Sequence, residues 1–298
     1  MTALASGSRR TADLLPLSDL SKGQAADFAA AWPLLAEADR VTIVRRMAEV
    51  AEDRLDLYFG RALRIALDDP SPVVRQLAIA ALWEDERTDL LQRFLVLAKD
   101  DASEDVRAEA AQGLGRFADR SATGEIDGSA SQAIRAVLGD IATDASSPYG
   151  VRRRALESMA GLGPDPGIAA LIADAYASDD QGLQASALFA MGRCLDSRWI
   201  DTVIEELGSE ESELRFEAAR AAGRLGDDRA VPGLAALAID PDAEVRYAAI
   251  AALGQVGGRT AAQVLRNLVD QAEEQDLEAI EEALEEGLAN ADPLQVRA

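Results

Sequence analysis

The sequence contains no histidine, and Cys194 is its only cysteine. Histidine is the usual general base near neutral pH and a common metal ligand, so His-based catalytic triads and His-ligated metal sites are excluded. A single cysteine can form neither an intrachain disulfide nor a structural zinc site of several thiolates. We therefore expect no cofactor and no metal. Cys194 itself is either a nucleophile or bilin attachment point, or an inert packed thiol.

Basic residues are also few, 30 against 53 acidic ones, which gives a formal net charge of −23. A field of this sign repels phosphate backbones and anionic lipid surfaces. We therefore expect neither nucleic acid nor a membrane as a partner unless a local basic groove overrides the field. No run approaches the roughly 18 apolar residues of a membrane helix. The opening residues do not form a convincing signal peptide, so we predict a cytoplasmic protein.

Aromatic residues make up only 4% of the chain, although hydrophobic residues make up 48%. Alanine and leucine dominate, and both favour helices. The β-branched and aromatic residues that favour strands are sparse. The composition therefore predicts an all-α protein.

A self-similar unit recurs along the chain, as a comparison of DDPSPVVRQLAIAALWED (68–85) with DPDAEVRYAAIAALGQVGG (240–258) shows. Successive copies of the valine–arginine position lie 30, 32, 45, 32, 31 and 31 residues apart. A degenerate further copy fits at Asp276–Leu277. The copies are Val44–Arg45, Val74–Arg75, Val106–Arg107, Val151–Arg152, Leu183–Gln184, Leu214–Arg215 and Val245–Arg246.

Apolar positions within each unit follow a helical period. In the last clear copy, Val245, Ala249 and Leu253 form one stripe, and a second helix precedes each valine–arginine pair. One antiparallel helix pair cannot bury its apolar stripe alone, but stacked pairs can. The repeat therefore predicts a solenoid of seven to eight helical hairpins.

An aspartate lies six residues before the arginine in several units, as Asp69 does before Arg75. The aspartate is suited to capping free N–H groups, and the arginine to reaching a carboxylate or carbonyl of a neighbouring loop. A recurring pair is typical of a structural role rather than a catalytic one. We predict a structural ladder made by Arg45, Arg75, Arg107, Arg152, Arg215 and Arg246.

The stretch ELRFEAARAAGRLGDDRAVPGLAALAIDPDAEVRYAAIAALGQVGG (213–258) resembles HEAT repeats of the short, phycobilisome-lyase-like type, and the resemblance extends over about residues 39–257. It implies a right-handed α-α superhelix whose second helices line the inner face. Such proteins are mostly protein-binding scaffolds, while some are bilin lyases or their chaperones and some are enzymes. The deoxyhypusine hydroxylases of this family hold iron with His–Glu pairs, which a chain without histidine cannot do.

The domain prediction is a disordered tail over 1–17, one solenoid domain over 18–292 and a short tail over 293–298. The 45-residue spacing places an exposed insertion loop at 118–132, either a contact element or a tolerated insertion. Near the end, residues 270–292 carry ten acidic and no basic side chains. We read a capping helix over 272–289 there, with an acidic docking site as the alternative.

The second and sixth positions after each valine should face the inner groove, because the valine and its +4, +5 and +8 neighbours form the buried stripe. Aromatic residues and arginine at these positions are typical of binding hot spots. If the helices are rotated differently, the same aromatic side chains are core. The candidate partner-binding residues are Arg153, Phe189, Phe216, Arg220 and Tyr247.

The sequence favours a non-catalytic scaffold that binds another protein or peptide along this groove. The motif GLGRFA (113–118) matches a dinucleotide fingerprint only weakly, because it lies at a helix end and the repeat accounts for it. A bilin-lyase-like enzyme or chromophore-handling subunit is the alternative. A DNA-binding glycosylase of similar fold is disfavoured by the acidic charge. The oligomeric state is not indicated by the sequence.

Overall fold

The computed structural model of the protein describes residues 13–54, 56–85, 87–269 and 274–291. Every regular element in these ranges is helical, which confirms the predicted all-α class. Tertiary contacts divide the chain into two compact units. The first unit comprises residues 1–117 and 132–155, and the second comprises 118–131 and 156–298. Most contacts in a solenoid are local, which favours such a division.

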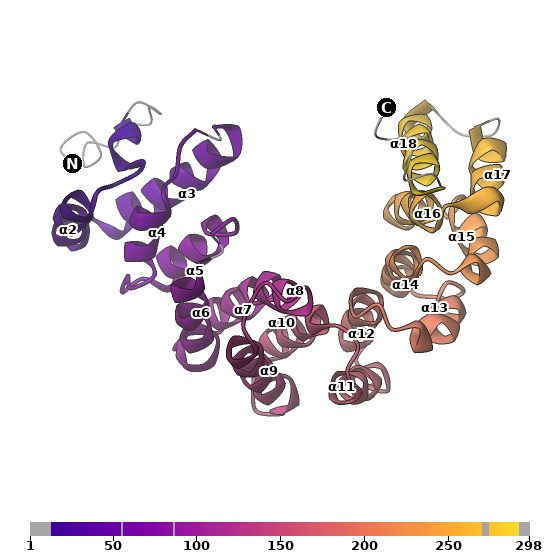
Figure 1. The fold of residues 1–298 in the computed structure, drawn as a ribbon, viewed down its shortest axis with the longest axis horizontal. Coiled ribbons are helices and arrows are strands. Elements are labelled where there is room, and N and C mark those ends of the chain that lie inside the picture. The colour runs from indigo at the N-terminus through magenta and orange to yellow at the C-terminus, as the bar shows by residue number, and fades with distance from the viewer. Residues whose placement is uncertain (1–12, 55, 86, 270–273, 292–298) are drawn as a thin grey trace. The chain divides into compact units, whose positions relative to one another are not determined.

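The first unit contains pairs of helices in which the second helix of each pair packs on the next. Helices α3, α5 and α7 pack in succession, and α4 and α6 pack against α5 and α7. Figure 1 shows these elements in indigo to magenta. They are η2 (Leu15–Leu17), α2 (Lys22–Ala31), η3 (Trp32–Leu34), α3 (Glu37–Asp53), α4 (Gly60–Ala66), α5 (Pro72–Ala81), α6 (Thr88–Asp100) and α7 (Glu104–Gly113).

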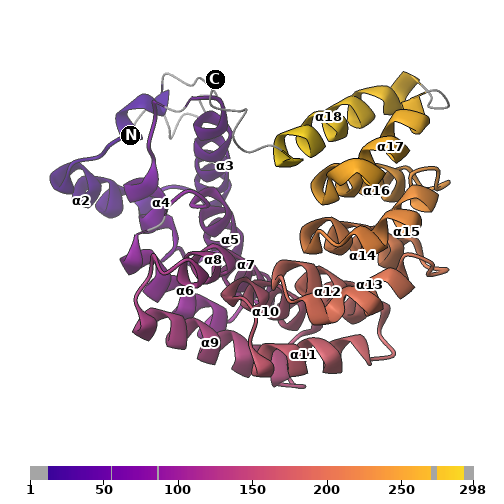
Figure 2. The same cartoon turned by 45° about the vertical axis from the view of Figure 1, so that its right-hand side comes forward.

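Three helices follow that cross the division between the units: α8 (Gly115–Ala122), α9 (Gly128–Thr143) and α10 (Tyr149–Met159). The second unit repeats the arrangement of the first. Helices α12, α14, α16 and α18 form one layer, and α11, α13, α15 and α17 form the other, as Figure 2 shows. The bounds are η4 (Ala160–Leu162), α11 (Pro166–Tyr176), α12 (Gln181–Arg193), η5 (Ser197–Trp199), α13 (Ile200–Glu206), α14 (Ser212–Leu225), η6 (Asp228–Ala230), α15 (Val231–Leu237), α16 (Ala243–Val256), α17 (Gly258–Val269) and α18 (Glu274–Ala291).

Local sequence sets where each helix begins and which face it buries. Helix α16 starts after Asp242, whose carboxylate accepts from the Glu244 N–H at 2.9 Å, as a helix N-cap does. Its stripe of Val245, Ala249 and Leu253 is at most 1% exposed. This is the stripe that the helical period predicts.

Small residues bring the second helices of the second unit close together. Gly192, Gly223 and Gly254 lie one repeat apart, each facing the backbone of the next second helix. A Cβ atom on Gly192 would lie 2.6 Å from the Ala221 Cα, and one on Gly223 would lie 2.9 Å from the Ala252 Cα. Only glycine permits this approach.

The aspartate and arginine of successive units form bidentate ion pairs. Arg75 donates from Nη2 and Nε to Asp101 at 2.7 and 2.8 Å, and Arg215 donates to Asp240 at 3.1 and 2.9 Å. Arg246 does the same to Asp276, at 3.3 and 3.1 Å. The Nη1 of each arginine also donates to the carbonyl six residues earlier. Each arginine thus ties its own turn to the carboxylate of the following unit.

Two other predicted ladder arginines donate to backbone carbonyls. Arg107 donates to the Asp101 carbonyl at 2.6 Å, and Arg152 donates to the Ala142 carbonyl at 3.4 Å. Arg45 is exposed, and its ladder role stays a prediction. Arg40 takes the contact with Asp69, because Arg40 lies at the start of α3 near the turn that holds this aspartate.

The predicted exposed loop over 118–132 is shorter in the structure. Residues 118–122 continue α8, and residues 128–132 begin α9. Leu114, Phe117 and Ala118 are fully buried, and Phe117 packs edge-on against Phe94 at 6.3 Å. The inserted segment is therefore held by apolar contacts at its start, and only residues 123–127 connect the two helices.

The chain ends also differ from their predicted bounds. Residues 1–12 of the predicted tail lie outside the described residues, while Leu14 and Leu17 are buried. Helix α18 begins at Glu274 and ends at Ala291, with Ile280 and Ala283 buried. The first two residues of the predicted cap, 272–273, and the predicted tail over 293–298 lie outside the described residues.

Asp85 in the first unit gives a testable pH dependence. Burial alone raises the pKa of its carboxyl, but hydrogen bonds from Arg87, Arg64 and Tyr58 outweigh this and hold the pKa well below its usual range. A lowered pKa contributes stability that is present above the unfolded-state value of about 3.9 and is lost as the pH falls through the folded-state value.

We expect Asp85→Asn to be less stable than the wild type at pH 7, with the difference shrinking below about pH 4. Urea unfolding at a series of pH values measures this difference. Asp56→Asn, at an exposed ion pair with Arg54, is the control. A difference for Asp85→Asn that stays constant into strong acid would contradict the expectation.

Candidate functional site

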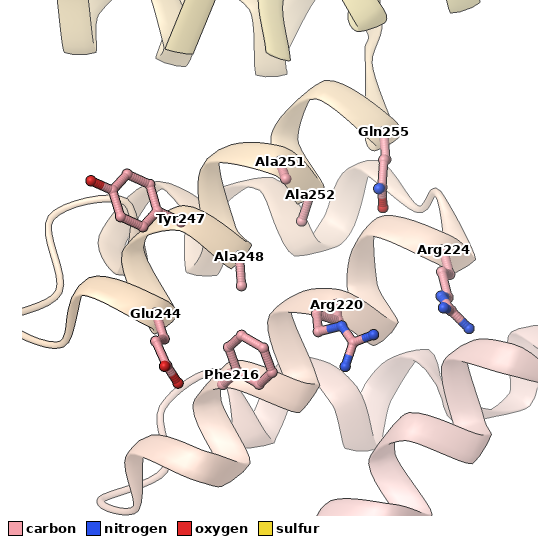
Figure 3. A pocket seen from close by; sticks show the side chains of 9 residues that line it. All are labelled: Phe216, Arg220, Arg224, Glu244, Tyr247, Ala248, Ala251, Ala252 and Gln255. Carbon is pink, nitrogen blue, oxygen red and sulfur yellow. The ribbon is translucent and has the colours of Figure 1, made fainter. Parts of the chain in front are cut away.

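A groove of about 610 Å³ lies on the second unit and is lined by residues of α14 and α16. Figure 3 shows Phe216 and Arg220 on α14 opposite Ala248 and Ala251 on α16. The full lining is Phe216, Arg220, Arg224, Glu244, Tyr247, Ala248, Ala251, Ala252 and Gln255.

Three of the predicted site residues line this groove. Phe216 and Arg220 are half-buried, and Tyr247 is 38% exposed. These three side chains therefore lie on the sides of α14 and α16 that line the groove. The Tyr247 hydroxyl is also engaged, because its hydrogen bond with the Asp276 carboxylate raises the pKa of the tyrosine.

The sequence reasoning missed the residues one turn further along each helix. Positions ten after the anchor continue the +2 and +6 stripe, and they are Arg193, Arg224 and Gln255. A step of four residues keeps a side chain on the same helix face, so continuing the count would have found them. Figure 3 shows Gln255 extending from α16 toward α14, at the end of the groove where Arg224 lies.

Three arginines gather around the Phe189 ring on α12. The guanidinium carbons of Arg224, Arg220 and Arg193 lie 5.2, 5.3 and 6.0 Å from the ring centroid. Arg220 also lies 5.4 Å from the Phe216 centroid. Guanidinium groups are attracted to aromatic faces at these distances. Phe189 thus forms the floor of an arginine cluster next to the groove.

The carboxylates near this cluster are occupied. Glu217 accepts from Arg220 at 3.0 Å, and Asp119 accepts from Arg193 at 2.7 Å. Burial raises the pKa of Glu217, although Arg220 opposes the shift. The pKa of Arg224 is lowered first by the partial removal of its guanidinium from water and then by repulsion from Arg220 and Arg193. The residue as a whole is nevertheless exposed.

Arg153 lies in the first unit, whereas the other four candidates lie in the second. Its guanidinium carbon is 5.7 Å from the Tyr149 centroid. The candidate site is therefore restricted to residues of the second unit.

Cys194 is buried at the end of α12, where its thiol donates to the Met191 carbonyl at 3.3 Å. Burial raises the pKa of this thiol, which disfavours the nucleophilic thiolate. These contacts agree with the inert packed thiol. Among the described residues, no cluster of three or more Cys, Asp or Glu side chains could hold a metal ion.

The GLGRFA motif also has a structural explanation. A Cβ atom on Gly113, at the end of α7, would lie 2.7 Å from the Phe94 ring. The glycine therefore makes room for an aromatic side chain of α6. The dinucleotide reading has no support in this packing.

Residues 61–125, 168–242 and 200–285 match the family model of HEAT repeats. This match covers more than half of the chain, in line with the stacked helix pairs and the arginine ladder. The chain belongs to the HEAT-repeat family.

Solved structures with similar folds include a chain of the CpcE–CpcF complex of phycocyanin lyase from Nostoc sp. PCC7120. It has a TM-score of 0.57 and 18% identity, with 85% of this chain and 95% of that chain covered. Escherichia coli YibA has a TM-score of 0.52 and 18% identity, with 94% and 97% covered. Importin beta has a TM-score of 0.53 and 14% identity, with 97% of this chain and 44% of that chain covered. At these identities the likeness shows the fold alone.

No curated protein matches the sequence. In the described part of the chain, no helix combines the length and the apolar character required to cross a membrane.

Proposed function

We propose that the protein is a non-catalytic scaffold that binds a segment of another protein in the α14–α16 groove. The observation that carries the proposal is the groove itself. Exposed Ala251, half-buried Ala248 and half-buried Phe216 form an apolar floor. Arg220, Arg224 and Glu244 provide charged groups at its sides. A concave apolar surface with a few polar groups is typical of binding sites.

The chemistry of the chain supports binding rather than catalysis. There is no histidine to serve as a general base, and the one cysteine is buried with a raised thiol pKa. The net charge of −23 disfavours nucleic acid and anionic membranes as partners. We place the protein in the cytoplasm, where a single reduced thiol is usual.

Ala251→Glu tests the groove directly, because Ala251 is exposed on the groove face of α16 and its substitution disturbs no core contact. We expect the added carboxylate to block a bound segment and abolish partner capture. The matched control is Ala236→Glu, at an exposed alanine on α15 in the other helix layer. Affinity capture from the source lysate, quantified by mass spectrometry, compares the wild type with both variants.

A protein lost with Ala251→Glu but retained with Ala236→Glu is the expected result. Equal capture by all three forms would refute the groove as the site. An absorbance scan of each eluate tests the tetrapyrrole alternative at the same time. A visible chromophore in the wild-type eluate would favour a chromophore-handling role over the scaffold.

A further inference from the structure

Arg224 differs from the other two arginines of the cluster because no carboxylate of the described residues is hydrogen-bonded to it. Arg220 is paired with Glu217, and Arg193 is paired with Asp119. Among the described residues, no hydrogen bond or ion pair is found for Arg224. Its guanidinium lies over the Phe189 ring and at the edge of the groove.

Arg224 is surrounded by more positive than negative side chains, so a further negative group would be attracted to it. Arg220 and Arg193 repel it, while Glu217 and Asp119, the carboxylates that attract it, already accept from those two arginines. Glu244, the acidic residue that lines this groove, lies more than two helical turns from Gln255 on α16 and marks the far end of the groove. An anion beside Arg224 would relieve the repulsion among three arginines.

We propose that Arg224 binds the carboxylate of an aspartate or glutamate in the segment that occupies the groove. A guanidinium offers two parallel N–H donors to a carboxylate, which fixes orientation as well as charge. The neighbouring Gln255 side chain supplies an amide at the same end of the groove. This inference rests on the proposed binding function and specifies its ligand.

The occupant that fits is a mainly apolar segment with one acidic residue. Ala248, Ala251 and Phe216 present apolar surface to the rest of the segment. A strongly acidic segment is disfavoured because the chain carries a net charge of −23. The carboxylate must therefore be recognised by a local contact rather than by the long-range field.

A library of displayed random short peptides tests both the proposed groove and the proposed carboxylate contact of Arg224. Peptides are selected on the wild-type protein and retained only if Ala251→Glu abolishes their binding. Affinities of the retained peptides are then measured for the wild type, Arg224→Gln and Arg229→Gln. Arg229 is an exposed arginine at the start of η6, outside the groove, so it controls for the loss of one charge.

We expect the retained peptides to share one aspartate or glutamate, and Arg224→Gln to weaken binding about ten- to hundredfold, as for a charge-assisted hydrogen bond. Arg229→Gln should have little effect. Replacing the peptide acid by its amide should cause the same loss in the wild type and little further loss in Arg224→Gln, since both changes remove one interaction.

Two outcomes would overturn the inference in different ways. Groove-dependent peptides that lack an acidic residue, or that bind Arg224→Gln as tightly as the wild type, would refute the carboxylate contact and leave the groove standing. Failure to select any groove-dependent peptide would refute the proposed function together with the inference. Circular dichroism of each variant confirms that the loss is not one of folding.

Discussion

Replacing Asp69 by alanine is expected to lower the free energy of unfolding of the first unit by about 3–5 kcal/mol, as for a broken buried ion pair. The Asp69 carboxylate accepts from Arg40 Nε at 2.7 Å and from Trp32 Nε1 at 2.7 Å. The Asp69 side chain is 0% exposed, and that of Arg40 is 8% exposed. Without the carboxylate, a buried guanidinium and an indole N–H lose their partner.

The comparison variant is Asp201→Ala, which removes an exposed ion pair with Arg229 in the second unit. Exposed pairs contribute little, so this variant should remain close to the wild type. Urea unfolding gives the stabilities, and hydrogen exchange locates the loss in α3 and α5. The double variant Arg40→Met, Asp69→Leu should lose less than the sum of its single changes, because it leaves no unpaired charge. Equal stability of Asp69→Ala and Asp201→Ala would contradict the buried contact.

Replacing Gly192 by alanine is expected to lower the free energy of unfolding of the second unit by about 1–3 kcal/mol, as overpacking does. The added Cβ atom would meet the Ala221 backbone, so α12 and α14 must move apart. Alanine favours a helix over glycine by about 1 kcal/mol, which offsets only part of this cost. Gly254→Ala should behave alike, since its Cβ atom would lie 2.7 Å from the Ala283 carbonyl oxygen.

The control is Gly150→Ala in the first turn of α10, where a Cβ atom meets nothing within 4 Å. Here the helix preference acts alone, and the variant should be as stable as the wild type or more so. Thermal unfolding followed by circular dichroism ranks the three variants against the wild type. If Gly192→Ala has the same melting temperature as Gly150→Ala, the close approach of α12 and α14 does not require glycine.

The candidate site was only partly predictable from the sequence. The repeat register assigns Phe216, Arg220 and Tyr247 to equivalent faces of α14 and α16. In the structure all three line the same groove. The same register contains Arg224 and Gln255, one turn further on. The register does not predict that Arg220 pairs with Glu217 and Arg193 with Asp119. Because of these two pairs, Arg224 is the arginine of the cluster without an ion pair among the described residues. Arg193 and Asp119 are 74 residues apart in the sequence, and Arg220 and Glu217 are three residues apart.

Repeat spacing misled the prediction where a few side-chain contacts decide the structure. The segment 118–132 is rich in glycine, serine and threonine, yet α8 extends into it behind the buried Phe117. Likewise, Arg45 matches the repeat spacing, but Arg40 reaches Asp69. The end unit has different neighbours from the interior units, so equal spacing does not give equal contacts there.

The sequence by itself determined the all-α class, the helix pairs and the register of the repeats. Each of these follows from local periodicity, which a single repeat already displays and its copies reinforce. Only the tertiary structure decided which arginine remains without a carboxylate, how closely α12, α14 and α16 approach, and which thiol or aspartate is removed from water. Those properties arise where neighbouring units pack together, and packing distances and ion-pair choices are not encoded in the spacing of residues along the chain.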